Sequence, residues 1–438
     1  MTSSVDGLAS GLNTTSMISS LMQVEAAPQT RLKTKVSAAQ TVVSSYQSVN
    51  SKLVALKNAA ADVGALSTWR GIKPTTNSTS VTATAVGGTN TTTGSMTFDV
   101  VSLAKGQSTT ARVPTTGNAT EADSFTVQVG SGDPVTIALT DKSAQGVADA
   151  LNKAGLGVKA SVVTTGGDKN ILQFTSSKTG TANGFTISGL DDVALATSAA
   201  TDAKLQIGGS EEEGGYSVTS GTNTFTGLMA GVTVTVGKVE TGVTMNVESD
   251  VSGMAAKFQA LVDAANAALT EVSDQTAYDP STKQSSPLTG DFMVRQMSQS
   301  ILSTVSTGLS YQNDDKQNVN FGSLSKFGIE LDRSGKLTFD SEKFTASYNA
   351  DPAGIKSAGI ALGDTFRTVA NTQISNVTSA ITGRKNAIDE MNVQIDNWDI
   401  RLAAKKTALS KQYSDLETAL GKLQSQGTWL SGQIASLG

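Results

Sequence analysis

The sequence contains no cysteine and no histidine among its 438 residues. The first absence excludes disulfide bonds, cysteine metal sites and thiol nucleophiles, and the second removes the commonest general base and transition-metal ligand. Ser-His-Asp and Cys-His catalysis are therefore excluded. Carboxylates alone can still support an enzyme, but no spacing of Asp and Glu points to one. We expect no enzymatic activity, no cofactor and no metal site.

Proline, aromatic residues and charge are also scarce, with seven prolines, 5% aromatic and 16% charged residues. The net charge of −5 argues against binding to nucleic acid or an anionic membrane, because both need a concentrated basic surface. No apolar run reaches the roughly 18 residues of a membrane span, so we expect no membrane insertion. The first thirteen residues lack the basic and apolar regions of a secretory signal, and we expect any export to use another route.

The residues that are present divide the chain into helical ends and a different middle. Residues 71–250 hold 25 of the 42 glycines and carry ten basic against sixteen acidic residues, whereas residues 1–70 carry six basic against three acidic. Alternating runs such as 80–86 and 232–236 are rich in β-branched residues and predict antiparallel strands. One helical stretch, 143–152, interrupts them. A mucin-like disordered stalk is the alternative for a Thr-rich region, but regular alternation with little proline argues against it.

The N-terminal end predicts a long amphipathic helix. Apolar residues recur at steps of three and four from Leu32 to Val63, which keeps one stripe on one helix face. The members of this stripe that we expect to contact a partner helix are Leu32, Val42, Tyr46, Val49, Leu53 and Leu56.

The C-terminal end carries a stronger heptad pattern, with an apolar residue every seventh position and no proline after Pro352. An uninterrupted helix from Ile374 to Leu430 would be about 85 Å long. The members of this line that we expect to form coiled-coil or partner contacts are Ile381, Ile388, Ile395, Leu402, Leu409, Leu416, Leu423 and Leu430. A second line is broken; its apolar members are Val377, Met391, Trp398, Tyr413 and Leu420, and its interruptions are Arg384, Lys405 and Gly427.

The broken line predicts a seam that is weakened at Arg384 and Lys405, because polar residues at core positions cost stability and select register or partner. A long helix inside an intramolecular bundle is the plainer interpretation. The two agree if the N-terminal helix runs up and the C-terminal helix returns antiparallel beside it.

Residues 251–373 return to helix, with a turn at Tyr278-Asp-Pro280, a second helix over 292–309 and a hairpin closed by Asp332-Arg-Ser-Gly335. We therefore predict an α+β multidomain protein, in which long terminal α-helices form a coiled coil and a helical bundle, with inserted antiparallel β-rich domains. The predicted divisions are a coiled-coil leg that is flexible in isolation (1–44 and 383–438), a helical bundle (45–72 and 251–382), a β-rich domain (73–112 and 201–250) and an outer β-rich domain with one short helix (113–200).

Several blocks of sequence, in order, resemble the bacterial flagellar filament cap family, also called hook-associated protein 2. The opening Val5-Asp-Gly-Leu-Ala-Ser-Gly-Leu-Asn13 and Met17-Ile-Ser-Ser-Leu-Met22 resemble its N-terminal signature. Residues 125–187 resemble the β-rich module shared by flagellins and hook-associated proteins. The blocks that resemble successive C-terminal segments of the family are 227–236, 258–266, 286–291 and 328–339. Ala264-Ala265 departs from the family, which often has an aromatic residue before the Asn.

The resemblance implies a ring-shaped homo-oligomer of about four to six copies at the extracellular tip of the flagellum. It implies flagellin and a flagellar export chaperone as partners, and export by the flagellar type III system without a cleaved signal peptide. The β domains would form a plate and the terminal helices would form legs on the filament end. A hook-filament junction or filament subunit protein, and a surface adhesin that binds host mucin or glycans, are the alternatives left open.

Overall fold

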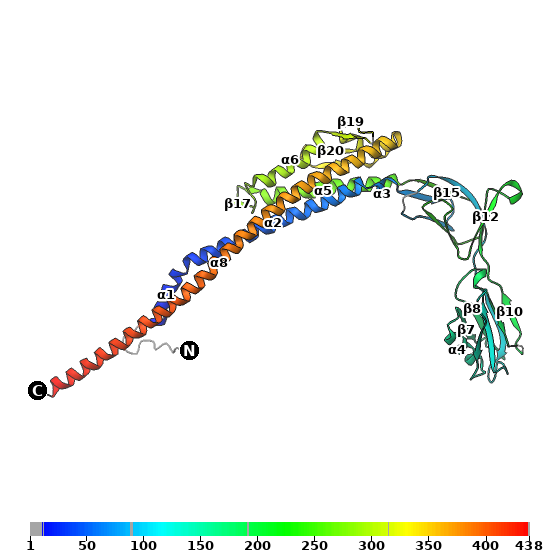
Figure 1. Cartoon of the computed structure of the whole chain (residues 1–438), viewed down its shortest axis with the longest axis horizontal. Helices are drawn as coiled ribbons and strands as arrows, with labels where there is room; N and C mark the ends of the chain where they lie inside the picture. Colours follow the sequence, from blue (N-terminus) through cyan, green and yellow to red (C-terminus); the bar gives the residue numbers. More distant parts are fainter. Residues whose placement is uncertain (1–10, 12, 88–90, 191, 314, 437–438) are drawn as a thin grey trace. The chain divides into compact units, whose positions relative to one another are not determined.

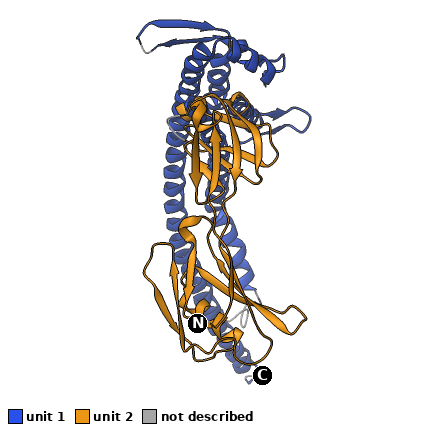
Figure 2. Ribbon diagram, turned by 90° about the vertical axis from the view of Figure 1, so that its right-hand side faces the viewer, with its two compact units in different colours: residues 1–65, 255–438 blue, residues 66–254 orange. Residues whose placement is uncertain are grey.

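The computed structural model describes residues 11, 13–87, 91–190, 192–313 and 315–436. The opening signature at residues 5–13 therefore lies almost wholly outside the described residues. The chain forms two compact units, one from residues 1–65 and 255–438 and the other from residues 66–254 (Figure 2). The first unit is mainly helical and the second is mainly antiparallel sheet, so the predicted α+β class is confirmed.

Among the described residues, six α-helices lie wholly or mainly in the first unit, and two of them are long. They are α1 (Thr14–Glu25), α2 (Ala27–Gly64), α5 (Val251–Thr276), α6 (Phe292–Ser306), α7 (Ser341–Ala350) and α8 (Pro352–Ala435). In Figure 1, α2 and α8 run side by side in opposite directions. With 84 residues, α8 is about 126 Å long. It begins well before the heptad line because Asp351 accepts a hydrogen bond from the Gly354 N–H (2.9 Å), which caps the helix in front of Pro352.

A close crossing of α2 and α8 explains the small residues near the start of α8. A methyl group added at Gly363 would lie 2.4 Å from the Gly64 nitrogen and 2.6 Å from the Ala60 oxygen. Only glycine lets the two backbones approach this closely. Larger side chains, Leu53, Leu56, Leu362 and Phe366, fill the interface on either side and are at most 1% exposed.

Short hairpins and an aromatic cluster complete the helical unit. The hairpins are β16 (Tyr278–Asp279) with β17 (Gln284–Ser285), β18 (Leu309–Gln312) with β19 (Asn318–Gly322), and β20 (Ile329–Leu331) with β21 (Leu337–Phe339). The turn before β21 has Gly335 at a φ of +83°, which confirms the predicted hairpin. Several aromatic residues pack together here, with the Phe258 ring centroid 5.2 Å from Phe327 and 4.8 Å from Phe344.

The first β module contains the strands from the beginning and from the end of the sequence of the second unit. Its five-stranded antiparallel sheet has the order β1-β15-β3-β11-β12 and its three-stranded sheet has the order β13-β14-β2. Their bounds are β1 (Ile72–Thr76), β2 (Val81–Ala85), β3 (Gly94–Ser102), β11 (Ala203–Ile207), β12 (Tyr216–Ser220), β13 (Thr224–Thr226), β14 (Val232–Val236) and β15 (Glu240–Ser249), preceded by the short α3 (Leu66–Trp69). Alternate residues of these strands, among them Phe98, Leu205 and Val234, form one core.

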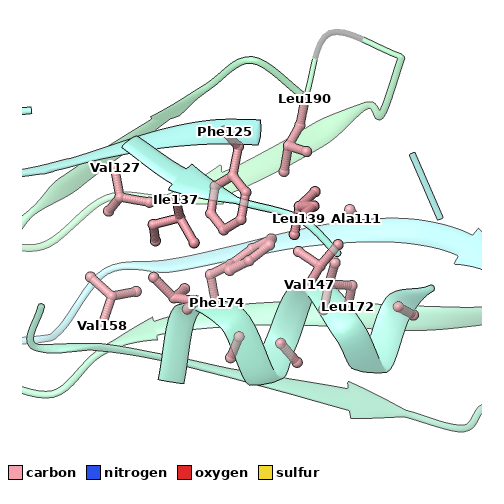
Figure 3. Packing of buried hydrophobic residues seen from close by; sticks show 14 of the residues in the cluster. Ala111, Phe125, Val127, Ile137, Leu139, Val147, Val158, Leu172, Phe174 and Leu190 are labelled. Carbon is pink, nitrogen blue, oxygen red and sulfur yellow. The ribbon is translucent and has the colours of Figure 1, made fainter. Parts of the chain in front are cut away.

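A second β module contains the intervening residues and has its own core. Its sheets have the orders β10-β4-β8-β7 and β6-β5-β9. The elements are β4 (Ser108–Pro114), β5 (Ser124–Val129), β6 (Val135–Ala138), α4 (Ala144–Ala154), β7 (Val158–Val163), β8 (Lys169–Ser176), β9 (Phe185–Ser188) and β10 (Leu195–Ser198). Figure 3 shows Phe125 and Phe174 turned toward one interior, with Val147 of α4 facing it from the helix. The predicted helical interruption among strands is confirmed.

Carboxamide side chains hold several backbone segments in the way that a neighbouring strand would. Asn152 on α4 donates to the Ala160 carbonyl (2.8 Å) and accepts from the Ala160 N–H (3.0 Å). Asn266 on α5 makes the same two bonds to Leu337 (2.8 and 2.9 Å). Each pair satisfies both backbone groups of a strand residue, so it fixes a helix along the edge of a strand that the neighbouring strand does not cover.

Candidate interaction surface

The helical unit contains a narrow seam between α2 and α8, where the sequence predicts partner contacts. Its buried members are Val36, Val43, Ile388 and Ile395, each 6% to 9% exposed, with Leu32, Ala39, Ile381 and Met391 packed against them. The buried members recur every seven residues on each helix, and half-buried Ala39 and Met391 lie between them, which is the heptad pattern of a two-stranded contact. The predicted residues Leu32, Ile381, Ile388 and Ile395 are therefore brought together.

The predicted residues of α2 fall into two groups. Val49, Leu53 and Leu56 are buried, at most 1% exposed, and Tyr46 is 3% exposed. Val42 is only half-buried, and its neighbour Val43 takes the seam position. The buried line through Gln29, Val36 and Val43 has a spacing of seven residues, a signal that the stripe of apolar residues at steps of three and four does not include.

The predicted residues of α8 become more exposed toward its end. Leu402 and Leu409 are half-buried, whereas Leu416, Leu423 and Leu430 are 45%, 62% and 55% exposed. Figure 1 shows α8 running on past α1 at this end. Among the described residues, the helical unit provides no partner helix for the last stretch.

The second apolar line of α8 changes its position relative to the first. Up to Leu402 it lies three residues after each member of the first line, as Met391 does after Ile388. From Leu409 onward it lies four residues after, at Tyr413, Leu420, Gly427 and Ile434. With about 100° per residue, the second line shifts by about 100° around the helix, and the middle of the seam turns by about 50°. The two parts of α8 therefore present different apolar faces, which the sequence prediction treated as one broken line.

Gln29 is a buried polar residue in the seam that the sequence prediction missed. It is 5% exposed, and its amide donates to the Ile395 carbonyl (3.3 Å) and to Asp399 Oδ1 (2.5 Å). A single satisfied polar group in an otherwise apolar seam fixes the register of the two helices.

A second polar contact joins α2, α6 and α8 where the seam meets the wider helical packing. The Tyr46 hydroxyl donates to Asp291, which also caps α6 by accepting from the Val294 N–H (3.2 Å). Burial, followed by the hydrogen bond and negative charge of Asp291, raises the pKa of Tyr46 to about 12, and Arg384 beside the hydroxyl opposes this rise. Arg384 interrupts the heptad line, yet it contacts the Tyr46 hydroxyl.

Lys405 also has a partner across the helices. Its ammonium lies 3.5 Å from a Glu25 carboxylate oxygen at the end of α1, with both side chains about half exposed. Beyond this pair, α1 carries a stripe at steps of four and three, Met17, Leu21 and Val24, whose exposure is 39%, 44% and 74%. The region around Lys405 therefore combines a weak ion pair with exposed apolar surface.

Acidic side chains elsewhere serve local turns. Glu213 accepts from the Ser210 N–H (3.2 Å), which closes a capping box over Glu211–Glu213. Hydrogen bonds from Ser334 and the Lys336 N–H hold the pKa of Asp332 below its ordinary value. Across the described ranges, no three carboxylates converge on a common point as metal ligands would. No helix in that part of the chain combines the length and apolar character needed to span a bilayer.

Two family models match the sequence. The model of the flagellar hook-associated protein 2 N-terminus matches residues 10–107, and the model of its C-terminus matches residues 200–425. Flagellar hook-associated protein 2 of Escherichia coli strain K12 is 26% identical over 465 residues, which cover 98% of this chain and 97% of that relative. The protein of the same name from Campylobacter jejuni is 31% identical over 177 residues, which cover 39% of this chain and 26% of that relative.

A solved structure is similar to this chain in fold. The crystal structure of domains D1-D2-D3 of the flagellar cap protein from Escherichia coli has a TM-score of 0.57 and 25% sequence identity, covering 78% of this chain and 99% of that chain. The two matched segments of sequence include all of α2 and most of α8. The likeness therefore includes both helices of the seam.

Proposed function

We propose, because this chain belongs to the flagellar hook-associated protein 2 family, that it forms the structural cap at the distal, extracellular tip of the bacterial flagellar filament. The observation that carries the proposal is the match of both ends of the chain to the two family models, residues 10–107 and 200–425. This match favours a cap over a hook-filament junction protein or filament subunit. No feature of the described residues favours a mucin-binding adhesin.

The proposed cap is a closed ring of identical copies. Its β modules form the plate over the filament tip, and its terminal helices form the legs that contact flagellin. We propose the division into leg, helical bundle and two β domains, with β4 placed in the outer domain because it pairs with β8 and β10. Separate hydrophobic cores in the two β modules support this division.

The legs hold the filament end and release it as each flagellin subunit folds and inserts beneath the plate. The thin seam supports this role, because only one residue per heptad is buried on each helix and the ion pair is exposed, so few contacts are lost when a leg moves. We propose export by the flagellar type III system with an export chaperone. A chain without cysteine cannot form disulfide bonds in transit.

Deletion of the gene followed by complementation tests the function. A strain without the cap should release flagellin monomer into the medium and build no filaments, and the intact chain should restore both, as seen by electron microscopy and by immunoblotting of the medium. Labelled protein should be found only at filament tips. Labelling along the filament would indicate a filament subunit, and labelling at its base would indicate a junction protein.

The marginal seam has its own test. The double variant Arg384→Leu with Lys405→Leu replaces both interruptions and should strengthen the contact between the helices. Filament growth should then slow, because a leg that binds the filament end more tightly releases it more slowly. Lys411→Leu serves as the control, since Lys411 pairs only with Asp415 on its own helix (3.0 Å). Unchanged filament growth in the double variant would contradict the proposed role of the weak seam.

A further inference from the structure

Methionine is the only sulfur-containing residue of this chain, which has ten methionines and no cysteine. Peroxides oxidise a thioether sulfur where solvent can reach it. Met245, Met254 and Met297 are 0% exposed, so solvent does not reach them in the folded chain. Met391 is different, because it is half-buried and belongs to the thin seam between α2 and α8.

Met391 lies in the middle of the apolar seam. It follows Ile388 by three residues and precedes Ile395 by four, and both of these residues are buried. It packs against the same cluster, whose members on α2 are Leu32, Val36, Ala39 and Val43. The thioether suits this position because it is apolar and flexible. Met391 therefore supplies part of the small apolar contact that holds the two helices together.

Oxidation converts this apolar side chain into a polar one with a strong hydrogen-bond acceptor. The buried amide donor of the seam is Gln29, which already donates to the Ile395 carbonyl (3.3 Å) and to Asp399 Oδ1 (2.5 Å). These two bonds account for both hydrogens of its side-chain amide. A sulfoxide buried in the seam would therefore lack a donor, at a cost in free energy that it avoids by turning toward water. The oxidised side chain favours an open seam.

We propose that Met391 is an oxidation site and that its sulfoxide opens the seam between α2 and the second half of α8. The thioether sulfur attacks one oxygen of hydrogen peroxide, and the O–O bond breaks. The sulfur keeps that oxygen and is oxidised by two electrons. The proton of the transferred oxygen passes to the departing hydroxide, so the peroxide is reduced to water.

The thinness of the seam makes one added oxygen sufficient. The seam buries four apolar residues, each still 6% to 9% exposed, so few contacts oppose its opening. The first half of α8 packs against α2 through large side chains without sulfur, such as Leu53 and Phe366, which are at most 1% exposed. Peroxide therefore loosens the second half of α8 and leaves the first half closed. This effect belongs to the single chain and does not depend on the cap function.

Amide hydrogen exchange of the full chain, before and after mild treatment with hydrogen peroxide, tests the proposal. Peptide mass spectrometry gives the sulfoxide fraction at each methionine. Oxidation of Met391 should accelerate exchange of the amides of residues 32–43 by about fivefold or more, the lower end of the cost of a buried polar group without a partner. The amides of residues 53–63 should be unchanged. Methionine sulfoxide reductases for both epimers, with a thiol, should restore slow exchange, and the thiol has no disulfide to break in a chain without cysteine.

Two matched variants separate Met391 from the other methionines. Met391→Leu removes the sulfur at nearly constant volume and should abolish the acceleration in the peroxide-treated chain. Met17→Leu is the control, because Met17 is 39% exposed on α1 and is not a member of the seam cluster; the acceleration should persist. Met391→Gln introduces a polar group without an oxidant and should accelerate exchange of residues 32–43 in the untreated chain.

Two outcomes would overturn the proposal. One is a Met391 that stays reduced under conditions that oxidise Met17, which would show that the seam shields its sulfur. The other is complete oxidation of Met391 with unchanged exchange of residues 32–43, which would show that the seam accepts the sulfoxide. Both outcomes concern the isolated chain, so they leave the cap function untouched, and filament growth reports on that function separately.

Discussion

The two halves of α8 pack in different ways, although they belong to one uninterrupted helix. Between Ile355 and Val377 a buried residue occurs every three or four positions, and Leu362, Phe366 and Val377 are at most 1% exposed. Between Ile381 and Ala435 the only buried apolar residues are Ile388 and Ile395, at 8% and 9% exposure. The first half is part of a domain core, whereas the second half is one side of a two-helix contact.

The difference supports the proposal that the first half of α8 is an anchor and the second half is a part that moves. The first half meets α2 at the close crossing of Gly363 with Gly64 and is enclosed by large side chains. The second half buries about one residue per heptad, so its contacts open at lower free energy. The contact of Tyr46 with Asp291 and Arg384 lies between the two halves, at the boundary between the closely packed and the loosely packed part of α8.

The largest contrast is expected from removing one large side chain in each half. Phe366→Ala should lower the free energy of unfolding of the helical unit by about 3–5 kcal/mol, because Phe366 is fully enclosed and leaves a cavity. Ile395→Ala should cost less than about 2 kcal/mol, the lower end of the range for such truncations, since solvent borders the seam. Urea unfolding followed by circular dichroism measures both. Equal losses would show that the second half is packed as tightly as the first.

A smaller loss is expected at the boundary between the halves. Tyr46→Phe removes the hydrogen bond to Asp291 and should cost about 1.5–3 kcal/mol, the range for a bond to a charged group. The pKa of Tyr46 is about 12 in the folded chain against 10.0 ordinarily. A raised pKa stabilises the fold below pH 10 and the effect is lost as the pH rises from 10 to 12. The unvaried chain should therefore lose stability over that interval, measured by urea unfolding at each pH.

The control for this prediction is the Tyr46→Phe variant itself, compared over the same pH interval. Since phenylalanine does not titrate, its curve should be flatter than that of the unvaried chain between pH 10 and 12. Parallel curves would mean that other groups account for any alkaline loss.

The elements that rest on local periodicity could be predicted from the sequence, and those that rest on tertiary contacts could not. The helix predicted from the heptad residues after Ile374 and the hairpin closed at Gly335 rest on signals within a short window, and the structure contains both. The start of α8 at Pro352 was missed, because Gly354, Gly359 and Gly363 give residues 352–373 a poor helical signal. The close crossing with α2 explains glycine at position 363. No local sequence pattern reveals that crossing.

Contacts between polar side chains far apart in the sequence were equally hidden. Gln29 and Asp399 are separated by 370 positions, and nothing in either neighbourhood specifies the other. The choice of Val43 over Val42 depends on the drift of a helix with 3.6 residues per turn against a seven-residue repeat. Which of the two residues becomes buried is determined only when the partner helix is in place.

Glycine substitutions give a contrast of opposite sign in the two halves. Gly363→Ala should cost about 1–3 kcal/mol, because the added methyl group meets backbone atoms that cannot move aside. Gly427→Ala should stabilise the helix by about 0.5–1 kcal/mol, since nothing lies within 4 Å of the added carbon and alanine is the better helix former. Thermal unfolding of the two variants measures both signs. Stabilisation by Gly363→Ala would show that the crossing is looser than described.

The smallest expected effect concerns the ion pair between α1 and the second half of α8. Lys405→Gln removes the partner of Glu25, and an exposed pair with both side chains about half exposed contributes about 0.2–1 kcal/mol. Hydrogen exchange of the α1 amides should therefore become faster by at most about fivefold, and the difference should shrink at high salt because the charges are screened. Lys411→Gln is the control, since its pair with Asp415 lies within α8 and should leave α1 unchanged. If Lys405→Gln accelerated exchange more than tenfold, α1 would depend on this pair, and the second half of α8 would be held by charge rather than by its thin apolar seam.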